Sequence, residues 1–420
     1  MNTTPSRIGF VSTRFSGTDG VSLESEKWAT VFKQMGHECF YFSGESDRPQ
    51  ESSVVVPEAH FNHPDIEAIN RDLFDDISRS SKTSGLIQAI RFHLKQHLYQ
   101  FLRTFDINLL VIENAFAIPM NVPLGLAMSE LIAETNIPTI AHHHDFAWER
   151  NRFAVNAAGD YLRSSFPPIL PSINHVVINS FAAQQLALRT GARSSLIPNV
   201  MDFDNPPPPP DDYALDLRES LGIGADQHFL LQPTRIVPRK RIELAIELTR
   251  RVDSDSVLVI THQSGDEGSA YEQRVREYAD LLDIRVIFGS DTVNHHRGET
   301  GDGRKIYSLA DTYQQADLVT YPSTIEGFGN AFLETLYYSR PLVISNYAIF
   351  KTDIQPKGFR VIGFDDFIED ETVKKTMEIL EDPSIGEEMA EHNYQIARRH
   401  YSYRILETSL ATILNQCMGS

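Results

Sequence analysis

Residues 317–346 constrain the fold more than any other part of the chain, because they read in succession as strand, glycine loop, helix and strand. The apolar run 318–321 predicts a buried strand. Residues 330–339 carry good helix formers, and Pro341 ends that helix before a second apolar run, 342–345. This succession predicts a doubly wound parallel sheet, which binds ligands at the carboxyl ends of its strands.

The loop inside this stretch has the composition of an anion site. Four residues follow Glu326 directly and lead into the helix: Gly327, Phe328, Gly329 and Asn330. Glycines let the backbone approach a ligand, and a helix amino terminus presents unpaired N–H groups to an anion. Glu326 in the loop and Glu334 about one turn into the helix therefore flank the predicted anion site. Such a pair suits hydroxyl groups on either side of a phosphate.

The composition limits the class of protein. A chain of 420 residues is long enough for two domains, and its hydrophobic and charged contents of 41% and 23% are ordinary for a soluble protein. The net charge of -19 argues against nucleic-acid or anionic-membrane partners. Two distant cysteines, no signal pattern and no apolar run of ~18 residues predict a cytoplasmic protein without a transmembrane anchor.

Basic residues gather between a predicted strand, 229–232, and a predicted helix, 242–252. They are Arg235, Arg239, Lys240 and Arg241. Four positive charges at a strand end and a helix start predict a second anion-binding element in an otherwise acidic chain. A solvated basic turn is the alternative. A predicted helix over 85–105 also carries basic side chains, for which a solvated face and recruitment of an acidic acceptor are both considered.

Three adjacent histidines, His142 to His144, follow the predicted strand 138–141 and precede Asp145. Neighbours on a strand point to alternate faces, so one metal ion cannot easily collect all three. An active-site role for His144, a structural role and a metal-ligand role are the three alternatives. The pair His295-His296 is a weaker metal candidate. Asp253-Ser254-Asp255 lies at the wrong end of a strand for a ligand site.

A run of five prolines, 206–210, predicts a stiff polyproline II spacer and hence a domain boundary. The predicted organisation is an amino-terminal Rossmann-like domain (1–205), a linker (206–212) and a carboxyl-terminal Rossmann-like domain (213–400). Residues 401–420 are predicted to form a helix that crosses back to the first domain. The dinucleotide fingerprint GxGxxG is absent.

Glu326-x7-Glu334, preceded by Tyr-Pro-Ser and followed by Arg-Pro-Leu-Val, resembles the signature of the retaining nucleotide-sugar glycosyltransferases of family 4. The resemblance implies the GT-B fold: α/β, with two facing doubly wound Rossmann-like parallel-sheet domains and the active site in the cleft between them. It also implies that Glu326 contacts the donor sugar and that Glu334 holds the ribose hydroxyls. Arg235 and Lys240 match the residues that grip the donor diphosphate.

The same resemblance implies roles in the first domain. His144 matches a histidine near the donor sugar, and Gly17 and Gly20 match a glycine loop that faces the donor phosphates and the acceptor. Three residues after His144 are expected on the acceptor side: Asp145, Trp148 and Arg150. At Arg241 the family usually has a glycine, and this departure leaves the shape of the basic loop open.

The function expected from this resemblance is transfer of a hexose from a nucleoside-diphosphate sugar to a hydroxyl acceptor, with retention and without metal or cofactor. GDP-mannose and UDP-glucose both fit as donors, and a small soluble sugar or sugar acid fits as acceptor. The alternatives are a GT-B epimerase, a phosphorylase and a non-catalytic regulatory subunit.

Overall fold

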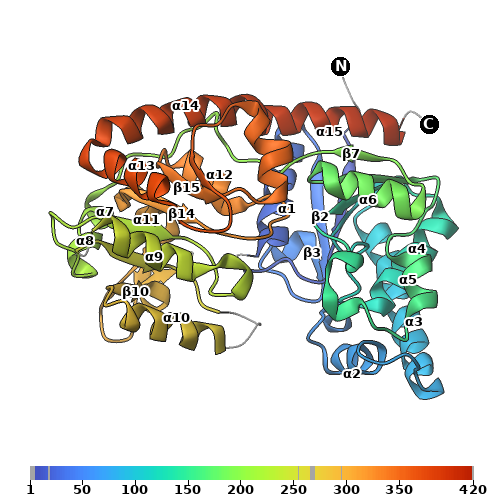
Figure 1. Cartoon of the computed structure of the whole chain (residues 1–420). Coiled ribbons are helices and arrows are strands. Elements are labelled where there is room, and N and C mark those ends of the chain that lie inside the picture. The colour runs from blue at the N-terminus through green and yellow to red at the C-terminus, as the bar shows by residue number, and fades with distance from the viewer. Residues whose placement is uncertain (1–4, 18, 254, 265–269, 295, 419–420) are drawn as a thin grey trace. The chain divides into compact units, whose positions relative to one another are not determined.

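The computed structural model describes residues 5–418 except 18, 254, 265–269 and 295. Its contacts divide the chain into a first unit, Met1–Val200 with Tyr403–Ser420, and a second unit, Met201–Ser402. Each unit is built on its own parallel sheet, so the predicted fold class of two Rossmann-like domains is confirmed (Figure 1). Among the described residues, no helix has the length and apolar character that a membrane crossing requires.

The first unit contains a seven-stranded sheet in the order β3-β2-β1-β4-β5-β6-β7, with every neighbouring pair parallel. Its strands are β1 (Arg7–Val11), β2 (Glu38–Ser43), β3 (Ser53–Val55), β4 (Leu109–Glu113), β5 (Thr139–His143), β6 (Ile173–Val177) and β7 (Ser194–Leu196). The strands β4 and β5 are entirely buried, as expected for a parallel sheet covered on both faces.

The helices of the first unit are α1 (Gly20–Gln34), α2 (Pro64–Leu73), α3 (Ser81–Thr104), α4 (Val122–Thr135), α5 (Gly159–Ser165), α6 (Ser180–Thr190) and α15 (Tyr403–Met418). The helix α15 packs against α1 and β6. Its Leu406, Leu410 and Ile413 recur at helical spacing and join Trp28 and Phe32 of α1 in one buried cluster. A segment from the end of the chain thus completes the core of the first unit.

Two basic side chains of α3 pair with acidic residues of α4. Arg91 bonds to Glu130 of α4, and Lys95 lies 2.8 Å from Glu134 of the same helix. These ion pairs support the solvated helix face rather than recruitment of an acidic acceptor.

The second unit contains a six-stranded parallel sheet in the order β10-β9-β8-β14-β15-β16. Its strands are β8 (Phe229–Gln232), β9 (Val257–Ile260), β10 (Val286–Phe288), β14 (Leu318–Tyr321), β15 (Leu342–Ser345) and β16 (Ile362–Phe364). Its helices are α7 (Asp212–Leu215), α8 (Leu217–Ser220), α9 (Ile242–Val252), α10 (Ala270–Leu281), α11 (Leu309–Gln315), α12 (Asn330–Tyr337), α13 (Asp370–Glu381) and α14 (Pro383–Tyr401).

The polar, glycine-containing sequence of residues 291–305 predicts a long loop. In the structure, parts of this segment belong to a small three-stranded sheet in the order β11-β13-β12. The strands are β11 (Val293–Asn294), β12 (Gly298–Glu299) and β13 (Lys305–Ser308). The hydroxyl of Tyr213 donates to the carbonyls of Gly298, at 3.0 Å, and Ile306, at 3.1 Å. Strands of two to four residues are too short to show a sequence period, so the prediction of one long loop missed them. His295 lies outside the described residues, and so does Ser254 of the Asp-x-Asp sequence.

The proline-rich segment 201–212 makes its contacts within the second unit. The hydroxyl of Tyr337 donates to the Asn205 carbonyl at 3.0 Å, and the side-chain amide of Gln314 donates to the Pro208 carbonyl at 2.7 Å. Arg297 forms a two-point ion pair with Asp211, at 2.6 and 2.8 Å. The Tyr394 hydroxyl also donates to the Phe203 carbonyl at 2.9 Å, and Arg398 lies 3.0 Å from Asp204. The segment is therefore held at several points along the second unit.

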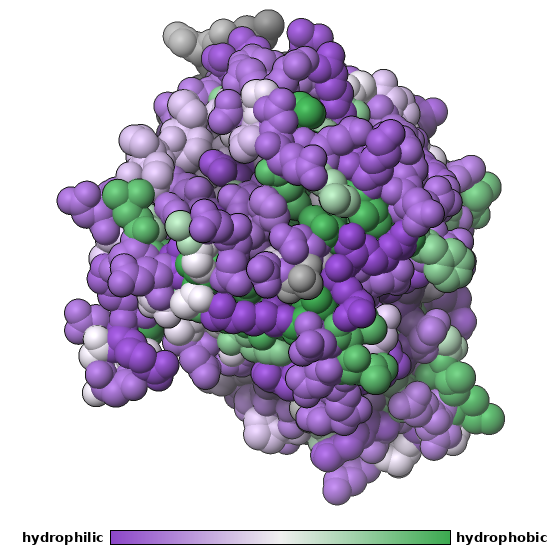
Figure 2. Space-filling view, turned by 60° about the vertical axis from the view of Figure 1, so that its left-hand side comes forward, coloured by the Kyte–Doolittle hydropathy of each residue, from purple (hydrophilic) through white to green (hydrophobic). Residues whose placement is uncertain are grey.

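Hydrophobic side chains on the surface are scattered. Figure 2 shows a face covered mainly by hydrophilic residues, with hydrophobic residues in small groups among them. This pattern is that of an ordinary solvated surface.

Candidate active site

In the second unit, the glycine loop between β14 and α12 is shaped by Gly329. This residue has φ +110°, and a Cβ added to it would lie 2.9 Å from the Tyr347 hydroxyl and 3.0 Å from that of Tyr321. The Tyr347 hydroxyl donates to the Phe328 carbonyl at 2.7 Å, which fixes the loop just before the helix. Among the residues that the structure describes, no side chain forms a capping hydrogen bond at the amino terminus of α12. The loop that is predicted to bind an anion thus depends on a backbone conformation that only glycine adopts readily.

Glu326 and the basic loop meet directly. The ammonium of Lys240 donates to one carboxylate oxygen of Glu326, and Arg239 lies 3.2 Å from the other. Burial raises the pKa of Glu326, but the positive charges of Lys240 and Arg239 outweigh it, so that this pKa lies below its usual range. Burial lowers the pKa of Lys240, and Glu326 opposes that shift. The structure therefore brings two predicted site residues into a buried ion pair.

Arg235 extends from the loop after β8, and its side chain is exposed. A histidine that sequence reasoning missed, His262, lies in reach of the same charges. Burial lowers the pKa of His262 to about 4, and the charges of Lys240 and Arg235 add to the effect. His262 lies just beyond β9 at the carboxyl end of the strand, and that position was the signal that could have indicated it.

Arg241 stands where the family that the sequence resembles usually has a glycine, and its backbone conformation is like that of a glycine. Its φ of +46° and ψ of 48° lie in the left-handed region, which is the conformation that a glycine would adopt without strain. The residue immediately precedes α9. The loop therefore has a glycine-like path despite the arginine.

Glu334 is held from the side by a tyrosine. The hydroxyl of Tyr313, on α11, donates to a carboxylate oxygen of Glu334 at 2.9 Å. Burial raises the pKa of Tyr313 well above its usual value, and the charge of Glu334 adds to this shift, so the phenol remains a donor. Sequence reasoning missed Tyr313, because no local pattern relates it to a residue on another helix.

In the first unit, the three histidines divide between two faces of the sheet. His142 Nδ1 lies 3.0 Å from Glu113 Oε2, and His144 Nε2 lies 3.4 Å from the same oxygen. His143 points the other way, where its Nε2 lies 2.9 Å from His175 Nδ1. The predicted alternation is confirmed, and Glu113 is a further polar residue that the sequence analysis did not select.

The Glu113 carboxylate is fully buried and ionised. Burial raises its pKa, but His142 and His144 outweigh that effect and bring it to about 2. For His144, burial lowers the pKa, while Glu113 and the nearby Glu24 raise it, with a net upward shift.

One potential metal-ligand atom from each of Glu113, His142 and His144 lies within 4.8 Å of the other two. Among the described residues, this group could therefore hold a metal ion. Both nitrogen–oxygen distances are within the range of hydrogen bonds, and a hydrogen-bonded network explains the arrangement without an ion.

The residues after His144 form a connected polar group. Asn114 accepts a hydrogen bond from the His144 backbone N–H and donates one to Asp145, both at 3.0 Å. Arg150 donates to the other carboxylate oxygen of Asp145. Trp148 stacks on Phe146, with ring centroids 4.4 Å apart. The structure thus brings His144, Asp145 and Arg150 together at the carboxyl end of β5.

The amino terminus of α1 is capped by the carboxylate of Asp19. Asp19 accepts hydrogen bonds from the backbone N–H groups of Val21, at 3.1 Å, and Ser22, at 3.2 Å. Gly17 has φ +75° with open space around it, and Gly20 is the first residue of α1. Because a carboxylate already caps this helix, a donor phosphate at Gly17 and Gly20 would compete with Asp19.

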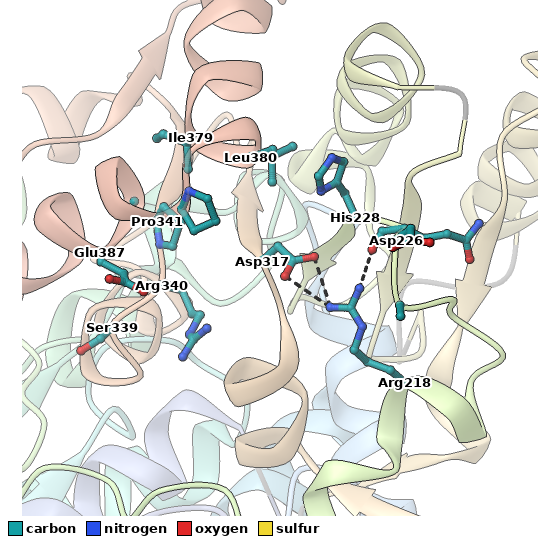
Figure 3. Close-up of a pocket in the computed structure, with 14 residues that line it drawn as sticks. Arg218, Asp226, His228, Asp317, Ser339, Arg340, Pro341, Ile379, Leu380 and Glu387 are labelled. Atoms are coloured by element: carbon teal, nitrogen blue, oxygen red, sulfur yellow. Dashed lines mark hydrogen bonds and ion pairs between the residues drawn. The ribbon is translucent and has the colours of Figure 1, made fainter.

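A cavity of about 360 Å³ lies at the amino-terminal ends of strands in the second sheet (Figure 3). His228, Asp317 and Pro341 line it, and each directly precedes a strand. Doubly wound sheets bind ligands at the carboxyl ends of their strands. The cavity lining contains none of the predicted site residues.

Comparison with known proteins identifies the family. No family model matches the chain. The chain is 33% identical to a mannosylglucosylglycerate synthase from Thermotoga maritima over 439 aligned positions, which cover 96% of this chain and 99% of the relative. The chain belongs to the mannosylglucosylglycerate synthase family of glycosyltransferases. A second member, from Petrotoga mobilis, is 30% identical over 85% of this chain and 86% of its own length.

The family membership agrees with the fold. A glycosyltransferase structure from Rickettsia africae superposes with a TM-score of 0.70 and 13% identity, covering 99% of both chains. The predicted GT-B fold and the predicted glycosyltransferase class are confirmed. The roles of individual residues in this member of the synthase family stay predictions.

Proposed function

We propose that the chain transfers mannose from GDP-mannose to a hydroxyl of glucosylglycerate, with retention at the anomeric carbon and without a metal ion. The similarity to a relative named mannosylglucosylglycerate synthase, along nearly the whole of both chains, carries the proposal. That product name requires a mannosyl donor, which favours GDP-mannose over UDP-glucose. It also requires a small sugar acid as acceptor.

The proposed donor site lies in the second unit. Arg235, Lys240 and the amino terminus of α12 stabilise the negative charge that develops on the leaving diphosphate. One such preorganised donor is typically worth about 3 kcal/mol of barrier. Glu334 holds the ribose hydroxyls. Glu326 contacts Lys240, and this contact supports its assignment to the junction of diphosphate and sugar, where it orients the sugar hydroxyls.

The chemical step breaks the bond between the anomeric carbon and the diphosphate oxygen, whose electron pair leaves with the nucleotide. The acceptor oxygen forms the new bond from the same face, and its proton passes to the departing phosphate oxygen. A separate general base is therefore unnecessary. His144 is assigned to the donor sugar, while Asp145, Trp148 and Arg150 are assigned to the acceptor.

The experiment is a matrix of donors and acceptors with purified protein. We expect GDP-mannose with glucosylglycerate to be the productive pair, with GDP released in equal amount. NMR of the product gives the anomeric configuration and hence tests retention. Turnover of UDP-glucose in place of GDP-mannose would overturn the donor assignment. Donor consumption without acceptor would favour the epimerase, and absorbance from bound pyridoxal phosphate would favour the phosphorylase.

A further inference from the structure

Glu113 is a buried charge without a role in the reaction described above. Its side chain has no solvent exposure, yet one of its oxygens contacts both His142 and His144. We propose that Glu113 is a positioning residue that fixes the tautomer and orientation of His144, so that His144 Nδ1 accepts a hydrogen bond from a donor-sugar hydroxyl. This inference rests on the proposed function for the identity of the sugar.

The sheet brings the three residues together. Glu113 is the last residue of β4 and lies directly beside His142 in the parallel register with β5. Side chains alternate between faces along an extended chain, so His144, two residues after His142, returns to the same face. One carboxylate oxygen therefore reaches Nδ1 of His142 at 3.0 Å and Nε2 of His144 at 3.4 Å.

The protonation of this group follows from the carboxylate. An ionised carboxylate only accepts hydrogen bonds, so both imidazoles must donate to it. His144 therefore carries a proton on Nε2. At a pH above its raised pKa the ring is neutral, and Nδ1 then keeps a lone pair. A hydroxyl group is the natural partner of that lone pair, because it can donate.

One further contact restricts His144, and another restricts His142. The His144 backbone N–H donates to Asn114 Oδ1 at 3.0 Å, and Asn114 directly follows Glu113. The Trp28 ring of α1 stacks on His142 with ring centroids 4.2 Å apart and an interplanar angle of 23°. His142 therefore cannot swing away from Glu113 without losing this stacking. The carboxylate is fixed by one histidine and positions the other.

Glu113 has no exposed surface, so it acts through His144 rather than on substrate. We expect Glu113→Gln to lower kcat by about 10- to 100-fold, since a misplaced group in a preorganised site costs up to about 100-fold. The affinity for bare GDP should stay within about twofold, because the diphosphate is held by the other unit. In a His144→Ala background the same change should have almost no further effect on kcat.

The matched control is Glu24→Gln. Glu24 is also a fully buried acid, and its charge acts on His144, but its oxygens pair with Lys27 and the Val200 backbone. We expect it to leave the His144 tautomer unchanged. Glu113→Asp keeps a carboxylate and should retain more activity than Glu113→Gln, and it serves as the second variant if the amide variant does not fold.

A nitrogen-15 NMR measurement of the His144 ring tests the inference without turnover. The spectra are recorded at a pH above the raised pKa of His144, where the ring is neutral. We expect the Nε2-protonated tautomer in the unaltered protein and a mixture of tautomers in Glu113→Gln. An Nδ1-protonated ring in the unaltered protein, a Glu113→Gln loss that persists in His144→Ala, or stoichiometric zinc bound by these residues would each overturn the inference. Absence of mannosyl transfer with the expected tautomer would refute the proposed function and leave the tautomer assignment in place.

Discussion

Replacing Gly329 with alanine tests whether the glycine loop is shaped by a close approach of two tyrosines. The φ of +110° would be strained for alanine, and strain of this kind costs about 1–3 kcal/mol. The new Cβ would also lie 2.9 Å from the Tyr347 hydroxyl and 3.0 Å from that of Tyr321. Overpacking of a buried site costs about 1–3 kcal/mol more. We therefore expect the free energy of unfolding to fall by about 2–6 kcal/mol in total.

Gly303 provides the control, because it has φ +81° but nothing within 4 Å of its added Cβ. Gly303→Ala should show only the conformational cost. In calorimetry of the full chain, a loss of about 3 kcal/mol in a unit of this size lowers Tm by about 6–12 °C. Gly329→Ala should also weaken GDP binding, which Gly303→Ala should not.

A second variant separates the two contributions. Tyr347→Phe removes the hydroxyl nearest to the new Cβ, together with its hydrogen bond to the Phe328 carbonyl. Gly329→Ala should therefore cost less stability in a Tyr347→Phe background than in the unaltered protein. Equal Tm values for Gly329→Ala and Gly303→Ala would refute the close-approach argument.

Four further outcomes are expected. Glu334→Gln should weaken GDP binding by about tenfold, and the deoxyribose analogue should bind the unaltered protein poorly; equal affinity for both sugars would remove the ribose role. Activity should survive EDTA, because side chains supply the positive charge, and a complete, metal-reversible loss would contradict this. Burial lowers the pKa of His143 well below 6.5 and that of His175 from 6.5 to about 4, so the unfolded chain binds protons that the folded chain excludes. The free energy of unfolding should therefore fall by about 3 kcal/mol from His175 as the pH drops from 6.5 to 4, and His175→Asn should flatten this dependence. Arg241→Gly should leave Tm nearly unchanged, whereas Arg241→Val should cost about 1–2 kcal/mol, since a β-branched residue fits the left-handed region badly.

The sequence predicted those parts of the molecule that depend on local patterns. The run 318–321 is mostly apolar, because a central parallel strand is buried on both faces. Gly329 marks a backbone conformation that few residues adopt. Family resemblance added the roles proposed for Arg235 and Lys240. The pairing of Lys240 with Glu326 could not be derived, because 86 residues separate them in the sequence.

The residues that sequence analysis missed share a physical cause. Glu113 lies at a strand end like many polar residues, and only the register of β4 with β5 shows that it faces His142. Tyr313 reaches Glu334 from a different helix. Side-chain pairs across neighbouring elements leave no period in the sequence. The small sheet formed by β11, β12 and β13 was missed because its strands are so short.

The packing of α15 has a consequence for synthesis of the protein. Leu406, Leu410 and Ile413 belong to the buried cluster of the first unit, but the ribosome makes them only after the whole second unit. Part of the apolar surface of the nascent first unit, around Trp28 and Phe32, therefore remains exposed until α15 has been synthesised. The second unit is one uninterrupted stretch of chain, so it can finish folding before the first. A chaperone that covers exposed apolar surface would act during this interval.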